Sequence, residues 1–75
     1  MPFRKIKDIR ENKRMSQEEL AIASGVSRTI ISGLETGSKQ NATAKTLVKI
    51  AGALGVSVHD VYETEGNPIF FENTV

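Results

Sequence analysis

Apolar residues recur along this chain at the three- and four-residue spacing of amphipathic helices, and short polar turns separate the groups. At residues 15–20, 26–31 and 56–61 the same pattern returns: an apolar residue, a serine, three residues and a second apolar residue. A serine can cap the first turn of a helix, and the two apolar residues can contact each other across that turn. The repetition predicts an all-α fold.

The segment that begins at Ser16 and ends at Gly37 predicts two short helices joined by a tight turn. Ser16 and Glu19 have the spacing of a capping box, in which each side chain binds the backbone of the other residue. Gly25 suits a left-handed turn residue, and Ser27 is a good N-cap for the second helix. Two helices with this spacing and apolar positions facing one core indicate a helix-turn-helix.

Three further helices are expected, from about residue 3 to 13, from 43 to 54, and as a very short helix after Ser57. Arg10 falls near the apolar edge of the first of these. It must therefore extend its charge to solvent or find a carboxylate partner. Arg14 lies in the following turn, at a position where glycine would be easier.

A chain of 75 residues can build one small core. We assign residues 1–64 to a five-helix domain and residues 65–75 to a short non-helical C-terminal tail. The tail contains an isolated apolar triplet, Ile69-Phe70-Phe71. This triplet can fold back on the helices, pair with a second subunit or stay disordered.

The charges are unevenly distributed along the chain. Residues 1–50 contain all ten basic residues and five acidic ones, whereas residues 51–75 contain four acidic residues. The basic part fits a polyanionic partner. There is no cysteine for a disulfide or thiolate metal site, and no apolar run of the length of a membrane span or signal peptide. We expect a cytoplasmic protein with no metal or cofactor.

Residues for catalysis are hard to identify. The only histidine, His59, is expected to face solvent, and the sequence has no phosphate-binding glycine loop, metal-ligand spacing or nucleophile constellation. Glu18 and Glu19 are explained by their place in the first turn of a helix. We therefore expect that the protein is not an enzyme.

The second helix of the helix-turn-helix can instead read DNA. Ile31 and Leu34 face the core, which leaves Arg28, Thr29 and Ser32 on or next to the outward side. The Arg28 guanidinium can bind guanine N7 and O6, and Thr29 can offer its hydroxyl, or its methyl group to thymine. These three outward residues are the candidate base contacts, although Arg28 taken alone would be an ordinary solvated residue.

Polar residues on both sides of this helix are expected to hold the DNA backbone. Gln17 begins the preceding helix, where its amide and the free backbone N–H groups can bind a phosphate. Lys39, in the loop that follows, is expected to strengthen binding to every sequence alike. The candidate backbone contacts are Gln17, Ser27, Lys39, Gln40, Asn41 and Lys45.

The chain resembles the phage-repressor-like helix-turn-helix family, the Cro- and Xre-type DNA-binding domains. The resemblance is carried by SQEELAxxSGVSRxxISxLExG, Ser16 to Gly37, and by TLVKIAGALGVSVHDVY, Thr46 to Tyr62. It implies a five-helix, lambda-repressor-like domain that binds a palindromic operator as a homodimer and regulates transcription, here as a repressor.

The resemblance also assigns roles to individual residues. Arg10 and Glu35 match positions that often form an ion pair between the first and third helices. Gly33 departs from the family because longer polar side chains are common there. Ile22 and Ala23 are unusually apolar for an exposed flank, which hints at an interface.

The dimer surface is the remaining expectation. Its candidates are the fifth helix and the tail, and the residues are Val58, Tyr62, Ile69, Phe70 and Phe71. Two alternatives stay open at this point. The chain can be the antitoxin of a toxin–antitoxin pair, with a toxin or another effector as protein partner, or a helical adaptor that has lost DNA binding.

Overall fold

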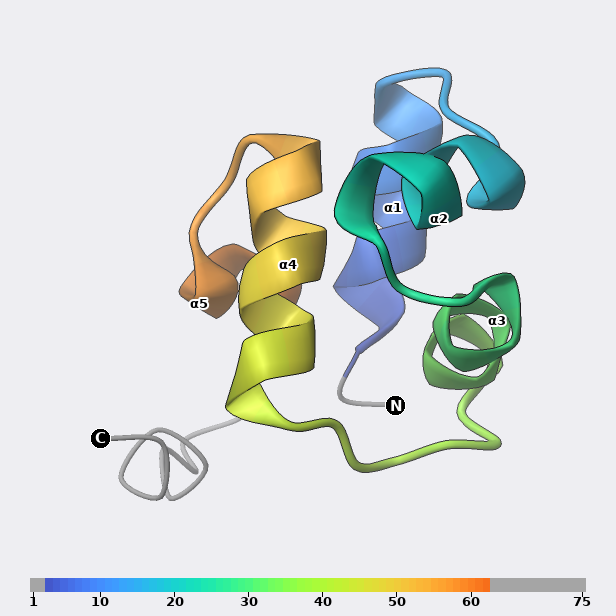
Figure 1. The fold of residues 1–75 in the computed structure, drawn as a ribbon, viewed down its shortest axis with the longest axis vertical. Helices are drawn as coiled ribbons and strands as arrows, with labels where there is room; N and C mark the ends of the chain where they lie inside the picture. The colour runs from blue at the N-terminus through green and yellow to red at the C-terminus, as the bar shows by residue number, and fades with distance from the viewer. Residues whose placement is uncertain (1–2, 63–75) are drawn as a thin grey trace.

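The computed structural model describes residues 3–62 and folds them into five helices without a strand. All five expected helices and the all-α class are confirmed. The apolar triplet at 69–71 and the boundary between residues 64 and 65 lie outside the described residues. The helices are α1 (Arg4–Asn12), α2 (Gln17–Ser24), α3 (Arg28–Thr36), α4 (Ala44–Leu54) and α5 (Val58–Val61), shown in Figure 1.

The helix starts follow the expected capping chemistry. The Ser16 hydroxyl accepts the Glu19 N–H at 3.0 Å, and the Glu19 carboxylate accepts the Ser16 N–H at 2.7 Å. This is the complete capping box predicted for α2. Ser27 and Thr43 cap α3 and α4 in the same way, with side-chain oxygens that accept N–H groups three residues ahead.

α5 begins with a carboxylate cap. Asp60 accepts both the backbone N–H and the hydroxyl of Ser57, each at 3.0 Å. These hydrogen bonds to the charged form, the backbone one first, lower the pKa of Asp60. Only four residues of α5 are helical, so this local cap matters for its start.

Left-handed backbone ends the helices where the sequence suggested it. Gly25, between α2 and α3, has φ of 75°, which costs glycine little. Arg14 has φ of 57° in the turn after α1, as its place in the sequence indicated. A residue with a Cβ is strained at such an angle.

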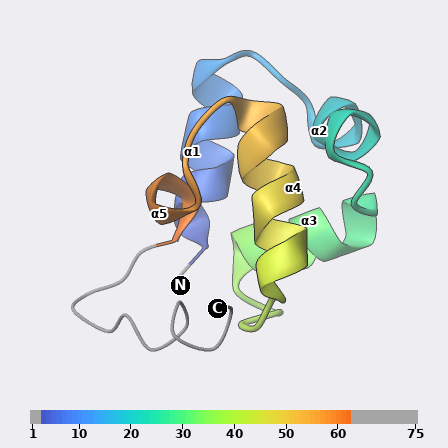
Figure 2. The same ribbon diagram turned by 60° about the vertical axis from the view of Figure 1, so that its left-hand side comes forward.

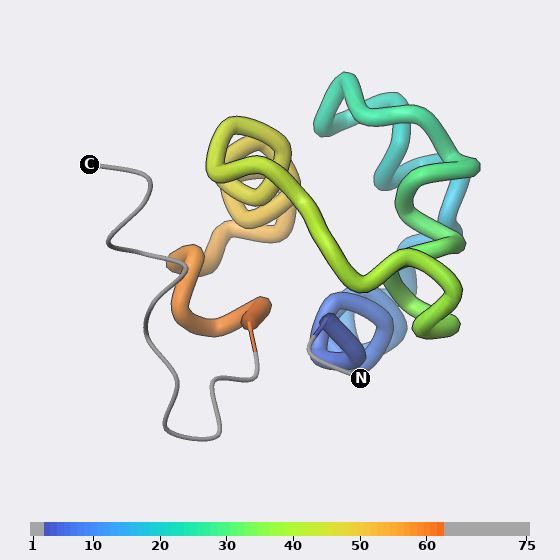
Figure 3. Tube along the Cα trace, turned by 90° about the horizontal axis from the view of Figure 1, so that it is seen from below, coloured from blue at the N-terminus to red at the C-terminus, as the bar shows by residue number. Residues whose placement is uncertain are grey.

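The helices pack as a small bundle around α1 and α4, as the views in Figures 1 and 2 show. α2 contacts α3 and α4, while α1 contacts α3 and α5, and α4 contacts α5. Seen from below in Figure 3, the segment after α3 crosses back to the start of α4. α3 is therefore held between the other helices on one side and this segment at its end.

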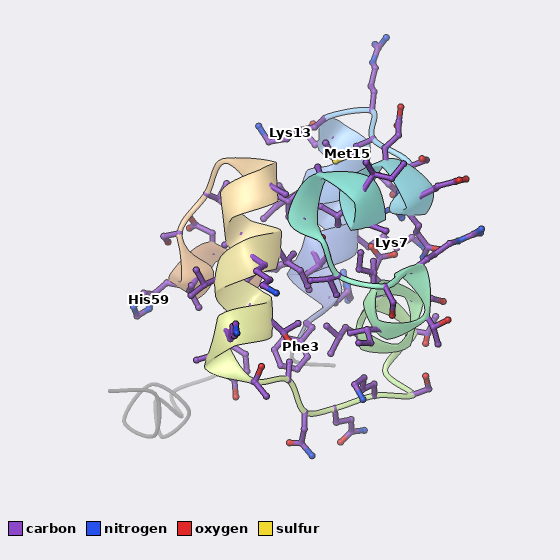
Figure 4. The ribbon with its side chains drawn as sticks, viewed as in Figure 1. Phe3, Lys7, Lys13, Met15 and His59 are labelled. Carbon is purple, nitrogen blue, oxygen red and sulfur yellow. The ribbon has the colours of Figure 1, made fainter. Side chains whose placement is uncertain are left out.

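One apolar cluster fills the centre of the bundle. The second apolar residue of each repeated pattern, Leu20, Ile31 or Val61, is completely buried in it. The Phe3 ring packs inward and lies 5.2 Å from the Tyr62 ring, and Figure 4 shows it below the crossing helices. The buried apolar residues are Phe3, Ile6, Leu20, Val26, Ile31, Leu34, Leu47, Ile50, Ala51, Leu54 and Val61.

Gly52 is an exposed glycine inside α4, and it offers a direct test of helix stability. A Cβ built there meets no atom within 4 Å. We expect Gly52→Ala to raise the free energy of unfolding by about 0.5–1 kcal/mol, because glycine loses more backbone entropy in a helix than alanine does. Urea unfolding followed by circular dichroism measures this change, and a destabilised variant would contradict it.

Candidate nucleic-acid interface

α3 turns one side to the core and the other to solvent. Ile31 and Leu34 are completely buried, whereas Arg28 and Thr29 are exposed and Ser32 is partly exposed. The structure thus places all three candidate base contacts on the side predicted for them. Three N-terminal positions of one helix then face outward together, which is the geometry that reading base edges requires.

A shallow hollow runs over the outward side of α3. It brings the candidate base contacts together with Gln17 of α2 and with the segment that follows α3. Its floor is predominantly polar. Its lining residues are Gln17, Arg28, Thr29, Ser32, Gly33 and Ser38.

A second, more apolar hollow lies between α3 and the start of α4. It contains two of the candidate backbone contacts, Lys39 and Asn41. Gln40 and Lys45 are exposed but line neither hollow. The lining residues of this hollow are Ile30, Lys39, Asn41, Ala42, Thr43 and Thr46.

Beneath α3 lies a buried ion pair that joins it to α1. Arg10 donates from Nε to Glu35 Oε2 at 2.8 Å and from Nη2 to Glu35 Oε1 at 3.0 Å. Its Nη1 donates to the backbone oxygen of Met15 at 2.8 Å. Arg10 is 8% exposed and Glu35 is 3% exposed, so the predicted pairing is confirmed as a buried, bidentate contact.

The hydrogen bond to Glu35 is the main cause of the raised pKa of Arg10, and it outweighs the opposing effect of burial. The guanidinium therefore stays charged, and Glu35 has a fixed cation beside it. α1, the turn before α2 and α3 are joined by this one side chain.

Gln17 connects the ion pair to the exposed side of α3. Its Nε2 donates to Glu35 Oε1 at 2.9 Å, and its Oε1 accepts from Arg28 Nε at 3.4 Å. The Glu35 contact fixes which way the amide points, because only the carbonyl oxygen can accept from Arg28. The second N–H of the amide is still available for a phosphate.

This link between Gln17 and Arg28 was missed at the level of the sequence, where Gln17 was expected only to bind the DNA backbone. The two residues are eleven positions apart on different helices, and no periodicity relates them. The one available signal is Glu35, whose carboxylate accepts more hydrogen bonds than a single arginine supplies.

Other kinds of site were sought within residues 3–62. No group of three or more histidine, cysteine, aspartate or glutamate side chains there is placed to hold a metal ion. Among the described helices, none has the length and apolar character needed to cross a membrane. His59 lies on the outer side of α5, away from α3, as Figure 4 shows.

Comparison with known proteins identifies this arrangement. Residues 6–61 match the helix-turn-helix family. The chain belongs to this family. An HTH-type transcriptional regulator of Sinorhizobium fredii, y4dJ, is 43% identical over 61 residues, which are 80% of this chain and 78% of that protein. The control protein C.BamHI of Bacillus amyloliquefaciens is 41% identical over 66 residues, 84% of this chain and 80% of its own length.

A solved structure agrees with these relatives. The restriction-modification controller protein C.AhdI of Aeromonas hydrophila superposes with a TM-score of 0.71 at 32% identity, over 76% of this chain and 85% of that one. The family, the relatives and the fold together make this chain a helix-turn-helix DNA-binding regulator of transcription.

Proposed function

We propose that the protein is a homodimeric repressor that reads a palindromic operator, with α3 of each subunit in one major groove. The observation that carries this proposal is the clustering of Arg28, Thr29 and Ser32 on the exposed side of α3, beside Gln17. In a symmetric dimer, the two half-sites are about one helical turn of DNA apart, roughly 34 Å.

The candidate residues divide between base reading and backbone binding. Arg28, Thr29 and Ser32 contact base edges, and Gln17 holds Arg28 while its remaining N–H binds a phosphate. The exposed polar residues at the two edges of α3 bind the backbone. These backbone contacts are Ser27, Gln40, Asn41 and Lys45.

The dimer contact is proposed for the α5 side of the molecule. Val58 and Tyr62 are partly exposed there, and both pack against the core from its surface. Ile69, Phe70 and Phe71 extend the proposed contact beyond the described residues. Sedimentation of the full chain measures the assembly, and a monomer at micromolar concentration would contradict this part of the proposal.

The relatives suggest which genes are regulated. C.BamHI and C.AhdI carry the names of control or controller proteins, and the latter acts in restriction-modification. We propose that this chain likewise controls restriction-modification genes from the cytoplasm, without catalysing a reaction. Repression of a reporter placed behind the DNA upstream of its own gene tests this role. Co-purification of a toxin would support the antitoxin hypothesis instead.

DNA binding itself is tested by selecting bound duplexes from a random pool and measuring their affinity at several salt concentrations. We expect one palindromic sequence to be enriched, with an affinity that falls steeply as salt rises because phosphate contacts release counterions. Indifference to all duplexes at low salt would support the adaptor hypothesis and overturn the proposal.

Arg28→Ala is expected to cost about 1–3 kcal/mol of binding free energy on the selected operator and to relax the preference at one base pair. The reason is the loss of a bidentate contact to guanine. Competition binding against every single-base variant of the operator measures the effect. Lys45→Ala is the matched control, because loss of a backbone contact weakens all sequences alike. Equal losses for Arg28→Ala on operator and random DNA would exclude base reading.

A further inference from the structure

Gly33 lies at the centre of the side of α3 that the proposed function places in the major groove. Each residue of a helix is turned by about 100° from the last, so Thr29 and Gly33 both lie on the side opposite the buried Ile31. A side chain at position 33 would therefore point directly at the bases. Glycine supplies none.

A lysine occupies this space instead. The Lys39 N–H donates to the Gly33 carbonyl at 2.9 Å, which brings the segment after α3 back onto the helix. A Cβ added at Gly33 would lie 3.0 Å from Lys39 Cβ and 3.8 Å from Lys39 Cδ. The aliphatic stem of Lys39 thus lies where a residue-33 side chain would begin.

The need for glycine here comes from close approach and not from backbone angle. Gly33 is an ordinary helical residue, unlike Gly25 and Gly37, whose φ values are positive. A contact of 3.0 Å requires the neighbour to move, and here the neighbour is a Cβ next to the backbone and not a flexible end. Gly33 and the position of Lys39 are therefore coupled.

Lys39 also has a direction along the interface. It lines the hollow that contains Ile30, whereas Gly33 and Ser38 line the neighbouring hollow with Arg28. Its stem consequently lies between the two hollows on the outward side of α3, and the residue is exposed. The edge of the interface, where a backbone contact was expected from the sequence, is a different place.

We propose that Lys39 supplies the base contact that Gly33 cannot make, and that it selects guanine in each half-site. The ammonium group donates to guanine O6 and N7, and the base pair it reads neighbours the one that faces Thr29. The inference rests on the proposed function, since it requires α3 to enter the major groove. It changes the role of Lys39 from a backbone contact to a specificity-determining residue.

The test measures the affinity of Lys39→Ala for the selected operator and for each of its single-base variants. We expect the ratio of affinities for guanine over the other bases to fall by about fivefold or more at one base pair, while the other positions keep their preferences. Lys45→Ala is the matched control and should lower all affinities by one factor, with a shallower salt dependence. The same uniform loss for Lys39→Ala would overturn the inference.

Gly33→Ala provides an independent arm that leaves the charge of Lys39 in place. Its Cβ displaces the Lys39 stem, so we expect a weaker preference at the same base pair that Lys39→Ala affects. Gly52→Ala adds a methyl group in open space and should keep every preference. An unchanged preference in Gly33→Ala, with folding verified by circular dichroism, would overturn the coupling.

The outcomes separate this inference from the proposed function. If the unmodified protein selects no sequence, both are wrong. If it selects an operator and Arg28→Ala relaxes one position, but Lys39→Ala relaxes none, only the assignment of Lys39 is wrong.

Discussion

Glu35→Ala is expected to lower the free energy of unfolding by about 3–5 kcal/mol, because it leaves the buried Arg10 charge without its bidentate partner. Gln17 loses its hydrogen bond to the same carboxylate. A domain of this size has little stability in reserve, so we expect much of the sample to be unfolded at 37 °C. Urea unfolding at 25 °C, followed by circular dichroism, measures the loss.

Two variants show whether the lost pairing is the cause. Glu18→Ala removes an exposed carboxylate from the first turn of α2 and should change stability by well under 1 kcal/mol. The double replacement Arg10→Met with Glu35→Leu removes both charges and should recover most of the loss, since a buried pair is often replaceable by apolar residues. If Glu35→Ala costs no more than Glu18→Ala, the ion pair does not stabilise the fold.

Phe3→Ala is expected to destabilise the protein by about 3–5 kcal/mol, the usual cost of deleting a buried aromatic side chain. The ring is 1% exposed and packs on Tyr62, so it joins the start of α1 to the end of α5. The cavity that remains would lie between two short elements with few other contacts. Thermal and urea unfolding both measure this effect.

Ile22→Ala is the control for Phe3→Ala. Ile22 is 77% exposed in the isolated chain, so its truncation should change monomer stability by less than about 0.5 kcal/mol. Phe3→Leu keeps most of the buried volume and should fall between the two. Similar losses for Phe3→Ala and Ile22→Ala would show that Phe3 does not belong to the core.

Local chemistry made the secondary structure predictable. A capping serine or threonine, the apolar residues on either side of it and the glycine at the other end act within one or two helical turns. Each can therefore be read from neighbouring letters of the sequence. The Ser16–Glu19 box, the left-handed Gly25 and the positive φ of Arg14 all follow from such short-range patterns.

The ion pair could be anticipated only in part. Arg10 was recognisable as a polar residue on an apolar edge, and the family resemblance supplied Glu35, 25 positions away. No property of the sequence between them fixes that distance. It depends on how α1 packs against α3.

The amino-acid sequence by itself determined five helices, their boundaries and the side of α3 that faces outward, because those features depend on contacts between near neighbours. Only the tertiary structure decided that Gln17 joins the buried Glu35 to Arg28, and that Lys39 covers Gly33. These contacts join separate helices and a loop. Their distances are set by the packing of the whole bundle, which no local pattern encodes.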